Sequence, residues 1–155
     1  MQLTYHRAGP EDLELLVRTR VETLRTANSL GPNADLSLVE AQSRAYYQTA
    51  LADGSHTAYL VLDGGACVGT GGISYYQVMP TCHNPSGQKA YIMNMYTAPA
   101  CRRRGIARRT LGLLVADAHA RGITHITLEA TDTGRPLYES CGFRLMGSEM
   151  ELSQI

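Results

Sequence analysis

The sequence predicts a mixed α+β fold, and three patterns support this class. Two β-rich runs, 57–62 and 66–78, flank Asp63-Gly64-Gly65, which is typical of an antiparallel hairpin. Apolar residues recur at helical spacing from Pro10 to Arg25. A strand, a helix and a second strand follow one another over residues 91–131, and this order indicates a parallel crossover.

The N-terminal half is expected to supply a strand and two helices before the hairpin. In chain order we expect a strand at 2–7, a helix at 10–25, a loop at 26–36 and a helix at 37–52. Pro10 suits the first turn of a helix. Ser37 and Glu40 have the spacing of a capping box. Glycines inside the second hairpin run favour a bulge or bend, with close approach of a backbone or ligand as the alternative; they are Gly69, Gly71 and Gly72.

The C-terminal half begins with a polar loop that contains two prolines. The elements then expected are a central strand from Tyr91 to Thr97, a helix from Gly105 closed by Arg121-Gly122, a strand at 123–131, a short helix at 134–141 and a last strand at 144–152. The last strand rests on alternation of apolar and polar residues alone.

Size and composition set the broad class. The 155 residues are most simply one domain, 1–155, and 44% hydrophobic content fits a globular protein. A formal net charge of zero gives no support to nucleic-acid or membrane-surface binding. The four cysteines form no CxxC pair, so we expect no metal site. Without a signal peptide pattern or an apolar run long enough to span a bilayer, we expect a cytoplasmic location.

Positive charge is concentrated between the central strand and the helix that follows it. Five arginines fall between positions 102 and 109, around Gly105 and Ala107. A helix that starts after such a loop has unpaired backbone N–H groups and the positive end of the helix dipole. The pattern predicts a phosphate site; a solvated basic surface is the alternative reading.

Two motifs carry a family resemblance. Arg102-Arg103-Arg104-Gly105-Ile106-Ala107 is similar to the Q/R-x-x-G-x-G/A signature of the GNAT superfamily of N-acetyltransferases, and Leu137-Tyr138-Glu139-Ser140-Cys141-Gly142-Phe143 resembles its LYEKxGF signature. They occur in the family's order, on the expected elements. The resemblance implies a mostly antiparallel central sheet of six to seven strands, with a parallel splayed strand pair and about four helices.

The resemblance also implies acetyl-CoA as co-substrate. The pyrophosphate would lie on the loop and helix start formed by Arg102, Arg103, Arg104, Gly105, Ile106, Ala107 and Arg108. The pantetheine arm would pair with backbone at the end of the central strand, Met95, Tyr96 and Thr97. Thr131 stands where relatives often carry an asparagine that contacts the cofactor.

Tyr138 is the implied general acid, which would protonate the CoA thiolate as it leaves; a packed core tyrosine is the alternative. The general base is less clear in the sequence. Many relatives have a carboxylate on the central strand where this chain has Met93 and Asn94. Asn94 can orient a water molecule, and Glu22 is a candidate base. Glu129 and His83 are further alternatives.

The acceptor site implied by the resemblance involves the first two helices, their loop and the connection before the central strand. In this chain these contain Arg18, Arg20, Glu22 and the segments 28–35 and 79–87, while Tyr75, Tyr76 and His83 are candidate pocket residues. None of them identifies a compound. Homodimers are common in the family, so a homodimer is a further expectation.

Three functions compete. The first is an N-acetyltransferase that moves an acetyl group from acetyl-CoA to a primary amine of a small molecule or peptide, by direct attack in a ternary complex. The second is a CoA-binding regulatory module without catalysis, which the missing strand carboxylate favours. The third is another nucleotide-binding protein, which ranks last because the chain has neither GxxxxGK[ST] nor GxGxxG.

Overall fold

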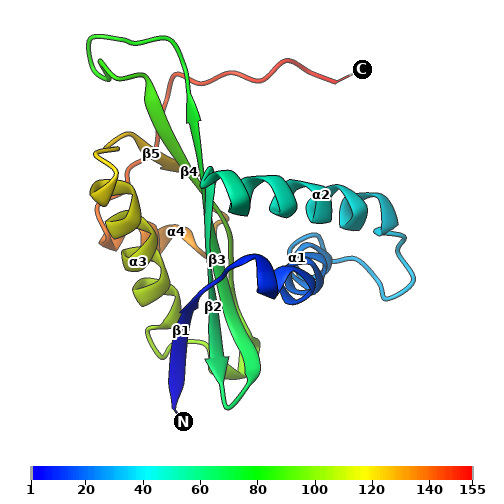
Figure 1. Cartoon of the computed structure of the whole chain (residues 1–155). Helices are drawn as coiled ribbons and strands as arrows, with labels where there is room; N and C mark the ends of the chain where they lie inside the picture. Colours follow the sequence, from blue (N-terminus) through cyan, green and yellow to red (C-terminus); the bar gives the residue numbers. More distant parts are fainter. Residues whose placement is uncertain (1, 155) are drawn as a thin grey trace.

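A computed structural model describes residues 2–154, in which one five-stranded sheet carries helices on both faces (Figure 1). The strands are β1 (Leu3–Arg7), β2 (His56–Asp63), β3 (Ala66–Gln77), β4 (Gln88–Thr97) and β5 (Ile126–Leu128). The α-helices are α1 (Leu13–Ala27), α2 (Ser37–Asp53), α3 (Ile106–Ala120) and α4 (Arg135–Ser140), with short 3-10 turns η1 (Pro10–Asp12) and η2 (Pro99–Cys101). Within these residues, no helix has the length and apolar character needed to cross a membrane.

The sheet has the order β1-β2-β3-β4-β5. Neighbours are antiparallel from β1 to β4, and β4 and β5 are parallel, with Ala90 opposite Ile126 and Ile92 opposite Leu128. The mixed α+β class, the hairpin and the parallel crossover are therefore confirmed. Beyond Leu128 the pairing stops while β4 continues to Thr97, so among residues 2–154 the end of β4 has no neighbour on its β5 side.

The helices divide the core into two layers. Helices α1 and α2 cover one face of the sheet, and α3 and α4 cover the other (Figure 1). Leu16, Val17 and Tyr47 pack on the first face against Ala58 and Leu60 of β2. On the second face, Leu111 and Leu114 pack against Ile73, Ala90 and Ile92. Both faces of the central strands are therefore buried. One layer places α1 and α2 beside β4, and the other places α3 and α4 beside it.

The glycines of β3 serve close packing within the protein. A Cβ atom at Gly71 would lie 2.6 Å from Cγ2 of Thr110 and 2.8 Å from Sδ of Met95. At Gly72 it would lie 2.8 Å from Nε2 of His56. The register with β4 also shifts between Thr70 and Gly72, so the expected bulge is present at the same place. The glycines let α3 approach one face of the strand and the His56 ring approach the other.

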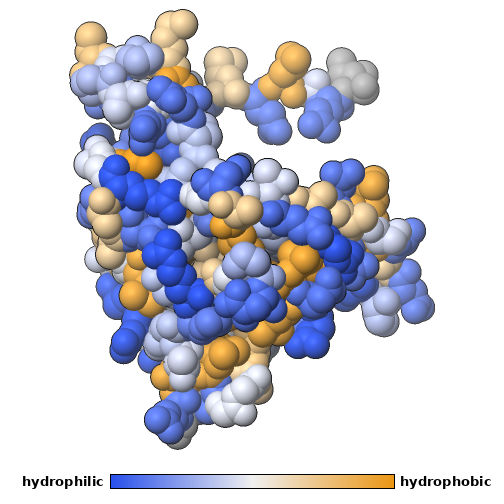
Figure 2. Space-filling model, in the orientation of Figure 1, coloured by the Kyte–Doolittle hydropathy of each residue, from blue (hydrophilic) through white to orange (hydrophobic). Residues whose placement is uncertain are grey.

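The predicted strand at 144–152 is wrong, and in the described part of the chain the sheet has five strands rather than six to seven. Residues 144–154 contain no strand, and the segment leaves the body of the molecule with apolar groups exposed (Figures 1 and 2). Leu145, Met146, Met150 and Leu152 are all exposed. Alternation alone does not form a strand, because the strand needs a ladder partner, and β5 offers only three residues.

The expected cap of α2 also differs. Ser37 is the first residue of the helix rather than its cap, and its N–H donates to Oδ1 of Asp35 at 2.9 Å. Asp35 therefore provides the side-chain oxygen that the sequence assigned to Ser37. Elsewhere the helix bounds lie within a few residues of those expected from the apolar periodicity.

Gly71→Ala should lower the free energy of unfolding by about 1–3 kcal/mol, because the added methyl group overpacks the contact between β3, Thr110 and Met95. Gly112→Ala is the matched control: this glycine lies inside α3 with no atom within 4 Å of the added Cβ. The control should raise stability by about 0.5–1 kcal/mol through helix propensity. Urea unfolding followed by circular dichroism measures both, and equal effects would contradict the packing argument.

Candidate active site

The predicted anion loop joins β4 to α3 and is open to a ligand. Gly105 precedes the helix with φ +81°, a left-handed conformation, and a Cβ atom there would meet nothing within 4 Å. Arg103 is also left-handed, at φ 63°. The Arg109 N–H donates to the Gly105 carbonyl at 3.0 Å, which closes the first turn of α3. The earlier N–H groups of that turn lie at the positive end of the helix dipole, where an anion is stabilised.

Arginine side chains hold this loop against its surroundings. Arg102 donates from Nε to the Thr97 carbonyl at 3.1 Å. Arg108 donates from Nη2 to Oγ of Ser140 at 2.7 Å and from Nη1 to Sγ of Cys141 at 3.3 Å. Arg108 therefore joins the two motifs that the sequence singled out, since Ser140 and Cys141 belong to the second. Arg103 and Arg104 lie on the exposed part of the loop.

A bulge interrupts β4 just before its end. Gly72 pairs with Met93 and Thr70 pairs with Tyr96, so Asn94 and Met95 stand opposite the single residue Gly71. Asn94 has φ 59°, which is uncommon for a residue other than glycine. Its carbonyl accepts a hydrogen bond from Oγ1 of Thr70 at 2.8 Å. Bulges and left-handed residues of this kind occur often beside active sites.

The bulge connects β4 to α1. Nη1 of Arg20 donates to Oδ1 of Asn94 at 3.2 Å. Beyond the bulge, Met95, Tyr96 and Thr97 continue the strand where β5 no longer pairs with it. This stretch of backbone can therefore pair with an extended ligand as an added strand does. The structure brings the predicted strand residues and the predicted loop to one end of the sheet.

Tyr138 lies on α4, packed against the core layer of α3. Its ring makes an edge contact with Phe143 at 6.1 Å between centroids. Burial raises the pKa of its hydroxyl, so the phenol keeps its proton at neutral pH. Thr131 fixes the start of α4, because its Oγ1 accepts the Gly134 N–H at 3.1 Å.

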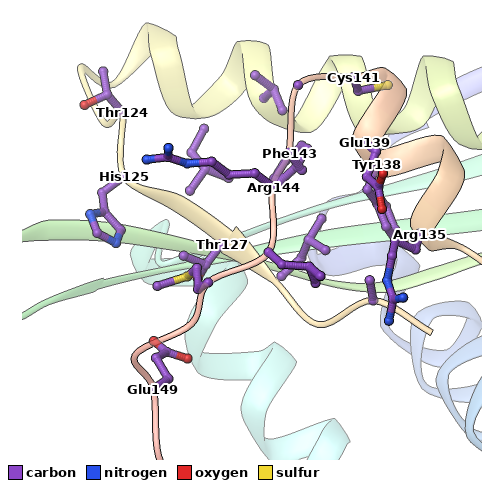
Figure 3. Close-up of a pocket in the computed structure, with 17 residues that line it drawn as sticks. Thr124, His125, Thr127, Arg135, Tyr138, Glu139, Cys141, Phe143, Arg144 and Glu149 are labelled. Atoms are coloured by element: carbon purple, nitrogen blue, oxygen red, sulfur yellow. The ribbon is translucent and has the colours of Figure 1, made fainter. Parts of the chain in front are cut away.

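A cavity of about 630 Å³ lies beside β5 (Figure 3). Its walls come from the approach to β5, from α4 and from the segment after Phe143, and Figure 3 shows Tyr138, Arg135, Arg144 and Glu149 around it. Of the predicted site residues only Tyr138 lines it, and the Gly105 loop does not. This cavity therefore lies beside the proposed acid rather than at the anion loop.

A second cavity, of about 450 Å³, lies between the α1–α2 layer and the sheet and reaches the β4 bulge. Met93 and Asn94 form part of its wall. Four tyrosines, Tyr46, Tyr47, Tyr75 and Tyr76, supply aromatic groups, and the polar residues of the wall are Gln42, Ser43, Ser55 and Ser74. Arg20 and His56 also line it. We call this space the tyrosine cavity.

His56 is a site residue that sequence reasoning missed, as are Tyr46 and Tyr47 in the same wall. It is only 5% exposed, and its Nδ1 lies 2.9 Å from the Tyr46 hydroxyl and 3.1 Å from Oγ of Ser74. Its Nε2 is buried and has no partner among residues 2–154. Burial, and secondarily the charge of Arg20, lowers the pKa of His56 to about 4. The signal was available, because counting in twos from Leu60 and Ala58 places His56 on the buried face of β2.

The other candidate bases lie away from the bulge. Glu22 is exposed on α1 and lines neither cavity; its charge acts on Cys67, near the start of β3. Glu129 is exposed after β5, and His83 is exposed in the loop between β3 and β4. Of the residues considered as base or water-orienting group, only Asn94 lies at the bulge.

Comparison with known proteins gives a consistent result. The model of the Acetyltransferase (GNAT) family matches residues 23–143. A predicted acetyltransferase from Clostridium acetobutylicum, crystallised with acetyl-CoA, is 32% identical over 98% of this chain and 96% of its own, with a TM-score of 0.89. A GCN5-related N-acetyltransferase from Ralstonia eutropha is 29% identical over 99% of both chains, with a TM-score of 0.84.

More distant structures share the fold. An aminoglycoside acetyltransferase from an uncultured soil sample is 23% identical over all of both chains, with a TM-score of 0.72. At this identity the likeness concerns the fold alone. No curated protein sequence matches this chain.

Lowering the pH should destabilise the protein through His56. The unfolded chain binds a proton on this histidine near pH 6.5, whereas the folded protein binds it only near pH 4. Between these values the unfolded state holds more protons, so the free energy of unfolding falls as pH falls, by about 3 kcal/mol for this group. Urea midpoints from pH 7.5 to 4 measure the slope.

His56→Gln should flatten that slope, while His83→Gln, which removes an exposed histidine, should leave it as in the wild type. A slope that persists in His56→Gln would show that another group causes it.

Proposed function

The chain belongs to the GNAT acetyltransferase family, and we propose that it transfers the acetyl group of acetyl-CoA to a primary amine of a small molecule or peptide. Acyl transfer from acetyl-CoA is the chemistry of the family, and acetyl-CoA is the co-substrate. The amine acceptor and direct attack within a ternary complex are the proposal. The observation that carries it is the β4 bulge at Asn94, which borders the tyrosine cavity and begins the unpaired strand end that leads to the Gly105 loop.

The donor side fits a pyrophosphate and an extended arm. Gly105 leaves the loop open at the start of α3, and Arg102 and Arg108 fix the loop to Thr97 and Ser140. Backbone N–H groups of Gly105 to Arg108, with the helix dipole, would hold the phosphates. The backbone of Met95, Tyr96 and Thr97 would pair with the pantetheine arm, which lies in an extended form beside an unpaired strand.

The acceptor side is the tyrosine cavity, which approaches the bulge from the α1–α2 face of the sheet. The two reactants would therefore meet at Asn94 and Met95 from different directions. Such placement supports direct attack, because holding both reactants in line supplies much of the rate acceleration. None of the four cysteines lines the tyrosine cavity, so its wall offers no thiol for a covalent intermediate.

Proton transfers would be divided between two faces of the site. Tyr138 keeps its proton at neutral pH and would donate it to the leaving thiolate. Asn94 would orient a water that takes the proton of the amine, and Glu22 ranks second because its carboxylate lies outside the cavity. The wall of the tyrosine cavity contains no carboxylate, and Arg20 adds positive charge. Both features disfavour an ammonium ion, so the neutral amine is the form that this cavity receives.

A CoA-binding module without catalysis is the second candidate. The same observation favours it, since neither Met93 nor Asn94 nor the rest of the cavity wall provides a strong base. We further propose that residues 1–155 form one domain, that the protein is cytoplasmic and that it forms a homodimer; these three points rest on the sequence and the family resemblance.

Acetyl-CoA should raise the melting temperature of the protein, and Gly105→Glu should abolish this shift, because an acidic side chain would enter the phosphate site. Gly122→Glu is the matched control. Gly122 has a similar left-handed conformation, φ 73° against 81°, and equally open surroundings, but it follows α3 instead of preceding it. The control should keep the full shift, after any loss of basal stability. No shift in the wild type would count against the donor site.

Tyr138→Phe should lower kcat for acetyl transfer by about 10²-fold, the size of a lost general acid, without changing the thermal shift by acetyl-CoA. Tyr59→Phe is the control, since Tyr59 packs against the same core cluster. The assay follows product by mass spectrometry across polyamines, amino acids, aminoglycosides and peptide N-termini. Full activity in Tyr138→Phe would remove the proposed acid. A wild type that binds acetyl-CoA and acetylates none of these amines would support the binding module.

A further inference from the structure

We propose that the tyrosine cavity binds an amine that also carries an anionic group, a carboxylate or a phosphate, close to the amine, and that Arg20 binds this group. The inference rests on the proposed function in one respect: the ligand of this cavity is taken to be the amine that accepts the acetyl group. It identifies a substrate class, small amino acids or aminophosphonates with an apolar or aromatic body, and a residue that selects it.

The charge of the cavity wall is the first observation. Arg20 is the only lysine, arginine, aspartate or glutamate that lines it. The guanidinium makes one hydrogen bond, from Nη1 to Oδ1 of Asn94, and no ion pair with a carboxylate among residues 2–154. Two other half-buried arginines form ion pairs, Arg44 with Glu14 and Arg135 with Asp132, while the half-buried Arg25 donates to the carbonyls of Gly31 and Ala34. Arg20 thus keeps planar, forked donors available for an anion.

His56 does not change this balance. It lies next to Arg20 in the wall, and its low pKa leaves the imidazole neutral at pH 7. The cavity therefore has one uncompensated positive charge. Such a site repels polyamines such as spermidine and also aminoglycosides, because these molecules carry several ammonium groups. It attracts a ligand whose own anionic group balances the positive charge of Arg20.

The position of Arg20 sets the spacing within the ligand. Its Nη1 is 3.2 Å from the side chain of Asn94, at the bulge where the amine would react. An anion bound to Arg20 is therefore only a few bonds from the reacting nitrogen, as in an α- or β-amino acid. Gln42, Ser43, Ser55 and Ser74 add polar groups to the wall, and its aromatic part comes mainly from Tyr47, which is buried, and from Tyr46 and Tyr76, which are exposed. Their rings suit an apolar or aromatic body, with the polar end of the ligand at Arg20.

Phenylalanine, its neutral amide phenylalaninamide, its phosphonate analogue 1-amino-2-phenylethylphosphonate and spermidine test the proposal. Binding to the protein saturated with CoA is measured by calorimetry, and acetylation in the presence of acetyl-CoA by mass spectrometry. We expect the carboxylate or the phosphonate to bind at least about tenfold more tightly than the amide, and spermidine to bind most weakly. The two anionic ligands distinguish carboxylate from phosphate recognition.

Variants then assign the effect to Arg20. Arg20→Met should abolish the preference for the anionic ligands, so that within this variant acid, phosphonate and amide bind equally, and Arg20→Lys should keep part of the preference. Arg44→Met is the control, because Arg44 is a half-buried helix arginine outside the cavity wall.

Equal binding of acid and amide by the wild type, preferred binding of spermidine, or absence of binding by every ligand would overturn the inference. A uniform loss for all ligands in Arg20→Met would do the same. Preferred binding of an anionic amine without acetylation would support the inference and contradict the proposed function. Failure of the inference and failure of the proposed function therefore give different results.

Discussion

The end of pairing between β4 and β5, next to a bulge in the ladder between β4 and β3, is the constraint on which the proposed site depends. On one side β5 stops pairing at Leu128, and on the other the bulge at Asn94 and Met95 interrupts the ladder with β3. Backbone polar groups in a sheet need partners, so this short stretch of β4 is open to an extended ligand. The Gly105 loop follows directly where the strand ends, and the α1–α2 layer borders the bulge. The proposed donor and acceptor sites therefore lie beside the same irregular strand.

Several contacts hold the irregular backbone in place. Thr70 bonds the carbonyl of Asn94, Arg20 bonds its side chain, and Gly71 leaves room for Met95 and Thr110. A left-handed non-glycine residue costs free energy and persists only where its surroundings determine it. These contacts involve three elements, α1, β3 and α3. The geometry of the reacting end therefore depends on the packing of both layers, and a substitution far along the chain can disturb it.

Local chemistry explains which elements could be predicted from the sequence. The hairpin, the crossover and the loop before α3 depend on turn residues, apolar periodicity and Gly105, all of which act within a few residues. The last strand was wrong because a strand requires a partner, which alternation in 144–152 cannot reveal. His56 and the tyrosine cavity were missed as a unit because α2, β2 and β3 meet only after the chain has folded. The sequence analysis named Arg20, Tyr75 and Tyr76 separately as acceptor-site candidates. It could not reveal the hydrogen bond between Arg20 and Asn94 that places Arg20 at the bulge.

The charge distribution links the two halves of the site. The chain has no formal net charge, yet arginines border both the Gly105 loop and the β4 bulge. On the α3 face, the buried carboxylate of Asp117 forms ion pairs with Arg7 and Arg121. A carboxylate at the bulge would hold an ammonium ion and would then have to remove its proton. Arg20 in that position gives the ammonium ion no ion pair, and the buried, neutral His56 adds none. If the cavity binds only the unprotonated amine, the enzyme needs no strong base to deprotonate it. The free-energy cost of deprotonation then weakens substrate binding instead of slowing the chemical step.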